Sequence, residues 1–89
     1  MKIKMGFELR QIGNEYIVVA SGIENINFNS IISMNSSSAW LWQQIEAKEF
    51  NKDILAELLL SKYNIDAETA LQDAAEITEQ WLTAGIIEE

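Results

Sequence analysis

The apolar pattern of this chain changes its period at Met34-Asn35, and this change constrains the fold more than any other feature. Before it, apolar residues recur at every second position, as in a strand with one buried face; after it, they recur at helical spacing. Asn35 and the serines at 36–38 can accept hydrogen bonds from the N–H groups of a first helical turn. The sequence therefore predicts an α+β fold, with strands before the junction and helices after it.

The N-terminal third predicts a three-stranded antiparallel meander. Gly13-Asn14 fits a two-residue hairpin loop, which needs positive φ, and a β-branched strand follows at 16–20. An asparagine-rich approach at 25–29 leads to the third strand, Ile31 to Met34. The first strand has an apolar face made of Ile3, Met5, Phe7 and Leu9. In such a meander the first and third strands keep one unpaired edge each, and we expect the third to be exposed.

Three helices are predicted from capping residues and the apolar stripes that follow them. The first extends from Ser36 to about Ala47, the second begins after Asn51, and the third extends from Asp66 to Gly85. Residues 86–87 pack back on the fold or form a short strand.

The tryptophans at helical spacing are more typical of core packing than of ligand contacts. Trp42 and Trp81 are expected in the core. Trp40 and Trp42 are about 200° apart around a helix, so one of the pair should be partly exposed.

Composition excludes several classes of function. The 89 residues contain no proline and no polar linker, which predicts a single domain over 1–89. The absence of cysteine and histidine removes thiol and imidazole catalysis, and the serines at 36–38 have no nearby base. We therefore expect no enzyme activity, no cofactor and no metal. The sequence also lacks a run of about 18 apolar residues, so we expect no membrane partner and a cytoplasmic location.

Charge disfavours a polyanionic partner. Fourteen acidic and six basic side chains give a net charge of −8. The third predicted helix contains no Lys or Arg at all. Generic nucleic-acid binding is therefore not expected, whereas a basic peptide is compatible with the charge.

Two stretches resemble the PqqD-like proteins, named for pyrroloquinoline-quinone biosynthesis protein D. Residues 34–42, MNSSSAWLW, are similar to the family's Leu-Asn-x-x-(Gly or Ser)-Ala-x-x-Trp segment. Residues 63–87 are similar to its Tyr, Ala-x-x-Asp-Val, Phe, Leu and Gly-Leu-(Val or Ile) ending. The chain departs from this pattern at Met34, where Leu is usual, in its all-Ser cap, and at Ala74, where Val is usual.

This resemblance implies a winged helix-turn-helix-like fold and a role as a peptide chaperone. In that family the leader of a ribosomally made precursor peptide adds a strand to the third strand and rests against the third helix. A separate enzyme, often a radical SAM enzyme, then modifies the presented peptide. The implied partners are thus a precursor leader and a modifying enzyme.

The expected binding site joins the edge strand to one wall of the third helix. Its residues are Ile31, Ile32, Ser33, Met34, Asp73, Glu76, Ile77 and Gln80. The acidic members would pair with Lys or Arg of a leader, with up to about 1 kcal/mol for each exposed pair. The simpler interpretation of Asp73, Glu76 and Glu79 is a solvated helix face.

Two other classes of function stay open at this point. A winged-helix nucleic-acid-binding protein would need a basic recognition helix, for which the second helix offers only Lys52 and Lys62. A structural or assembly subunit would form a homodimer through its exposed edge strand.

Overall fold

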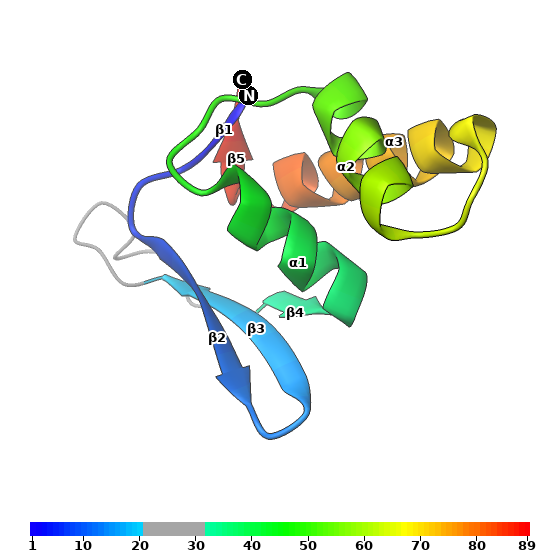
Figure 1. Ribbon diagram of the computed structural model, residues 1–89. Coiled ribbons are helices and arrows are strands. Elements are labelled where there is room, and N and C mark those ends of the chain that lie inside the picture. Colours follow the sequence, from blue (N-terminus) through cyan, green and yellow to red (C-terminus); the bar gives the residue numbers. More distant parts are fainter. Residues whose placement is uncertain (21–31) are drawn as a thin grey trace.

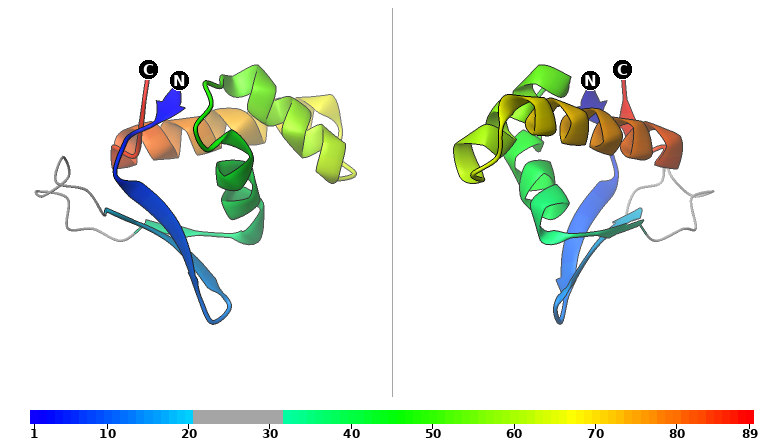
Figure 2. Two further views of the ribbon diagram at one scale, coloured as in Figure 1. Left: turned by 60° about the vertical axis from the view of Figure 1, so that its left-hand side comes forward. Right: turned by 90° about the vertical axis from the view of Figure 1, so that its right-hand side faces the viewer.

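A computed structural model describes residues 1–20 and 32–89 of the chain. Its main sheet is antiparallel, with strand order β2 (Phe7–Ile12), β3 (Glu15–Ala20) and β4 (Ile32–Met34). The helices α1 (Ser36–Ile45), α2 (Lys52–Lys62) and α3 (Ala67–Ala84) lie on one side of this sheet (Figures 1 and 2). The predicted α+β arrangement of three strands and three helices is confirmed. The winged helix-turn-helix-like fold that the family resemblance implies stays a prediction. The asparagine-rich approach at 25–29 lies outside the described residues.

The first predicted strand is divided in two at Gly6, whose φ is +92°. Its first part, β1 (Lys2–Ile3), leaves the main sheet and pairs with β5 (Ile87–Glu88) in a separate two-stranded sheet. The prediction that Met5 shares a buried face with Phe7 was therefore wrong. Met5 is 77% exposed, because the backbone turns between the two strands.

The short C-terminal strand that the sequence left open is present. In the small sheet Ile3 pairs with Ile87, and the N–H of Lys4 donates to the carbonyl of Ile86 at 3.1 Å. Both Ile86 and Ile87 are buried. The two terminal segments of the chain are thereby paired with each other.

The β2–β3 hairpin has the predicted two-residue loop, with Ile12 paired to Glu15. Gly13 has a φ of +61°, whereas Asn14 does not have the positive φ that the sequence suggested. Glycine at the first central position is typical of a type II′ turn, which needs positive φ only there.

Each helix begins at the predicted cap. The side-chain oxygens of Asn35, Asn51 and Asp66 accept hydrogen bonds from backbone N–H groups three residues on, at 2.7 to 2.8 Å. Hydrogen bonds that Thr69 donates to Asp66, the larger effect from its backbone and the smaller from its side chain, lower the pKa of Asp66. Helix α1 ends two residues earlier than predicted, because Ala47 has a φ of +60° and cannot continue a right-handed helix.

The core lies between the sheet and the helices. Trp42 and Trp81 are both buried and meet edge to face, with ring centroids 5.4 Å apart. Trp40 is half-buried and packs against Tyr63, with the Lys62 ammonium 4.7 Å from its ring centroid. This confirms the predicted division between buried and partly exposed tryptophans. Within the described ranges, no helix is both long and apolar enough to cross a membrane.

Candidate functional site

The β4 strand forms one edge of the main sheet. It pairs with β3 through Tyr16–Met34, Ile17–Ser33 and Val18–Ile32, and no described strand pairs with its other side. The direction of each backbone group follows from the hairpin, because the two residues that flank a two-residue loop form a hydrogen-bonded pair. Counting from Ile12–Glu15, the N–H and C=O groups of alternate β3 residues face β4, beginning with Tyr16.

Ser33 is therefore the β4 residue whose backbone faces outward. Ile32 and Met34 form hydrogen-bonded pairs with β3, so their N–H and C=O groups are used within the sheet. By the same alternation the N–H of Asn35, which is extended with φ −77° and ψ 174°, also faces the open edge. The edge thus offers two N–H donors and one carbonyl acceptor within the described residues.

The side chains of β4 add little to this edge. Met34 is 8% exposed and belongs to the core, and Ile32 is half-buried against it. Ser33 is exposed, but its side chain points to the sheet face away from the helices. Ile31 lies outside the described residues. Whatever binds here would contact backbone at the edge and would find its side-chain pockets elsewhere.

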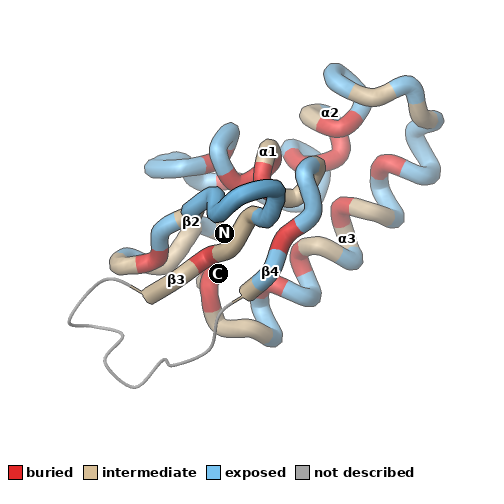
Figure 3. Tube along the Cα trace, turned by 90° about the horizontal axis from the view of Figure 1, so that it is seen from below, coloured by how far each residue is buried: buried red, intermediate tan, exposed pale blue. Residues whose placement is uncertain are grey.

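Helix α3 lies on the β4 side of the sheet, away from β2, in Figures 1 and 3. Two adjoining hollows follow its exposed face, with volumes of about 230 and 440 Å³, and they share Glu76 and Gln80. We call these two hollows together the α3 groove. The smaller one reaches the start of α1, and its lining residues are Asn35, Ser37, Ser38, Leu59, Asp73, Glu76, Ile77 and Gln80.

All four predicted α3 residues thus lie around one hollow, beside the junction that follows β4. The sequence missed the other side of this hollow. Asn35 was interpreted only as a helix cap, and Leu59 of α2 was not predicted as a site residue, yet both line the hollow. A helix cap next to a strand end is a local signal, but the approach of α3 to that cap depends on tertiary packing.

The α3 groove is acidic. Asp73, Glu76 and Glu79 line it, and α3 carries no Lys or Arg. The ion pairs in the described ranges, Lys2–Glu88 and Arg10–Glu8, do not involve this helix. Asp73 and Ile77 are half-buried, whereas Glu76 and Gln80 are exposed. The groove therefore has a partly apolar floor with uncompensated carboxylates around it.

A solved structure described as "TbiB1 in Complex with the TbiA(beta) Leader Peptide" is similar in fold, with a TM-score of 0.78. The alignment covers 99% of this chain and 95% of that one, at 14% sequence identity. Among curated proteins, no sequence matches this chain significantly. The family model described as "Coenzyme PQQ synthesis protein D (PqqD)" matches residues 15–87. Because this match extends from β3 into β5, over most of the sequence, the chain belongs to the PqqD family.

Proposed function

We propose that this protein is a non-catalytic peptide chaperone that binds the leader of a ribosomally made precursor peptide by strand addition to β4. The observation that carries the proposal is the outward-facing backbone of Ser33, at an edge of the sheet flanked by the α3 groove. An extended peptide placed there would continue the sheet, and alternate side chains would point toward the groove. The solved structure with the similar fold contains a leader peptide of its own system, which supports this class of ligand.

The energetics suit a peptide that binds through a few strong positions. Each backbone hydrogen bond contributes a net stabilisation of about 0.5–1.5 kcal/mol. Micromolar affinity corresponds to about 8 kcal/mol, so the three bonds at Ser33 and Asn35 supply only a part of it. The remainder has to come from leader side chains. An apolar side chain would pack on Ile77, and a Lys or Arg would approach Asp73 and Glu76.

Specificity for the leader would therefore come from α3 and its carboxylates. The modifying enzyme, which we propose to be a radical SAM enzyme on the strength of the family resemblance, would act on the presented peptide. The chaperone itself would leave the peptide chemically unchanged, because it brings no thiol or imidazole to the site.

The test is binding of a fluorescein-labelled leader peptide from a precursor gene that neighbours the gene of this protein. Fluorescence anisotropy should show saturable binding, and a scrambled peptide of the same composition should bind at least about tenfold more weakly, a difference of 1.4 kcal/mol. Equal binding of the two peptides would contradict recognition by sequence. Mass spectrometry of the full precursor after incubation with the purified protein alone should show an unchanged mass, and a mass change would contradict the non-catalytic role.

A further inference from the structure

The second open edge of the main sheet belongs to β2, and no described strand pairs with it. β2 has six residues, twice as many as β4. The alternation fixed by the Ile12–Glu15 pair directs the backbone of Glu8 and Arg10 toward β3. It directs the N–H and C=O groups of Leu9 and Gln11 outward.

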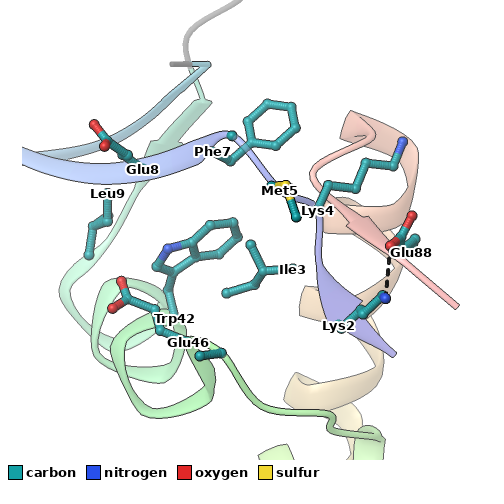
Figure 4. Close-up of a pocket in the computed structure, with 12 residues that line it drawn as sticks. Lys2, Ile3, Lys4, Met5, Phe7, Glu8, Leu9, Trp42, Glu46 and Glu88 are labelled. Carbon is teal, nitrogen blue, oxygen red and sulfur yellow. Dashed lines mark ion pairs between the residues drawn. The ribbon is translucent and has the colours of Figure 1, made fainter. Parts of the chain in front are cut away.

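A hollow of about 720 Å³ adjoins this edge (Figure 4). Trp42 points into it from α1 and lies between Leu9 and Ile3. Leu9 is half-buried and stands on the helix side of the sheet, at the border of the hollow. A second strand paired with β2 would place its own side chain beside Leu9, in the space next to Trp42. The fold thus leaves room for an apolar side chain at this edge.

The sequence of β2 is complementary to itself about Leu9. In an antiparallel pair of two copies centred on this residue, Leu9 faces Leu9, Glu8 faces Arg10, and Arg10 faces Glu8. The backbone directions agree with this register, because Leu9 faces outward and can form the hydrogen-bonded pair on the two-fold axis. Glu8 and Arg10 then form the closer, non-hydrogen-bonded pairs, where opposite charges stabilise a sheet.

The neighbouring registers are disfavoured by the same charges. A shift of the axis by one residue toward the N-terminus places Glu8 opposite Glu8, and a shift toward the C-terminus places Arg10 opposite Arg10. Like charges directly opposite each other destabilise strand pairing. Within one chain Arg10 already meets Glu8, at 3.1 Å from Nη2 to Oε2, so both side chains extend along the exposed face of the strand. The charges therefore favour the register centred on Leu9 over these two neighbours.

We propose that two copies of this chain associate through their β2 edges in the register centred on Leu9. The main sheets would join into one sheet of six strands, with a β4 edge at each end. Because β2 and β4 are opposite edges, association would leave both proposed leader sites open and would make the assembly bivalent. The net charge of −8 on each copy opposes association, so the assembly is weak and depends on concentration. This inference goes beyond the proposed function and does not depend on it.

Sedimentation equilibrium of the full chain tests the proposal. The weight-average mass should rise above the 10.1 kDa of one chain between about 10 μM and 1 mM, the range expected for a weak contact. Arg10→Glu should weaken association by about tenfold, because two attractive pairs become two repulsive ones. Glu8→Arg should do the same, and the double variant Glu8→Arg with Arg10→Glu should restore it to within about twofold, since the charges are exchanged.

Gln11→Pro provides a test that does not depend on charge. Proline is tolerated on an edge strand where its missing N–H faces outward, and its ring blocks the approach of another strand. This variant should keep the circular dichroism spectrum of the parent and sediment as a monomer. A parent chain that stays at 10.1 kDa to 1 mM would overturn the proposal. So would association that Arg10→Glu leaves unchanged, that the double variant fails to restore, or that Ser33→Pro abolishes instead.

Discussion

The two open edges of the main sheet differ in what surrounds them. The β4 edge is short, its apolar side chains turn into the core, and the α3 groove beside it supplies carboxylates. The β2 edge is longer and carries its own opposite charges, Glu8 and Arg10, next to an apolar hollow. Unpaired backbone alone makes either edge a site for another strand. The difference indicates that the side chains around an edge decide its partner: a foreign peptide at β4 and a second copy at β2.

Ser33→Pro should separate the two edges with the largest effect. The N–H that it removes faces outward, so the β3–β4 ladder is kept, but an incoming leader loses a donor and meets the proline ring. We expect leader affinity to fall by at least about tenfold, which corresponds to 1.4 kcal/mol. Gln11→Pro makes the same change at the β2 edge and should leave leader affinity within about twofold of the parent, a difference below 0.5 kcal/mol.

Circular dichroism and thermal unfolding should show that both proline variants are folded. If Ser33→Pro unfolds, leader peptides with single N-methylated amides give the same information without a change in the protein. Alternate methylated positions should then lose affinity, because every second backbone group of an added strand faces β4. Uniform tolerance of methylation, or equal losses in the two proline variants, would break the proposed distinction between the edges.

Reversal of the groove charges should have the next largest effect. Asp73→Lys with Glu76→Lys should weaken a leader that carries Lys or Arg by about fivefold, and the loss should shrink in about 0.5 M NaCl because exposed charges are screened. The control matched for net charge compares Glu76→Lys alone with Glu57→Lys, because each reverses one charge and Glu57 lies on the exposed face of α2, outside the groove. An equal loss of leader affinity from Glu57→Lys would indicate long-range attraction to the whole protein and would contradict recognition of the leader by the groove.

Removal of helix caps should give the smallest effect. Asn35→Ala and Asn51→Ala each remove a side-chain oxygen that accepts a backbone N–H at 2.8 Å, and each should lower the free energy of unfolding by about 1 kcal/mol. Only Asn35 borders the β4 edge and the α3 groove. Its variant should therefore weaken leader binding by about two- to threefold, or about 0.5 kcal/mol, while Asn51→Ala leaves it unchanged. Urea unfolding and anisotropy check both values.

Much of the fold could be predicted because its signals are local. The caps at Asn35, Asn51 and Asp66 lie where the apolar period predicted helix starts, and the hairpin loop lies at Gly13-Asn14. The division at Gly6 was missed because the alternation of apolar residues continues across it. A glycine with positive φ redirects the backbone without changing that period.

The candidate site was predictable only on the face of one helix. Helical spacing brings Asp73, Glu76, Ile77 and Gln80 together, and the structure places all four around one hollow. The contribution of Asn35 and Leu59 to the same hollow was not visible, because it depends on how α3 packs against two other elements. The outward direction of Ser33 also required the register of two strand pairs.

The most direct test of leader binding at β4 is an NMR titration of the ¹⁵N-labelled protein with the leader peptide, at one fixed protein concentration so that any contact between copies stays the same throughout. We expect the amide shifts to concentrate at Ser33, Asn35 and the α3 groove, while the amides of Leu9 and Gln11 stay unchanged. Shifts at Leu9 and Gln11 with an unchanged Ser33 would contradict it, because they would place the leader on the opposite edge of the sheet.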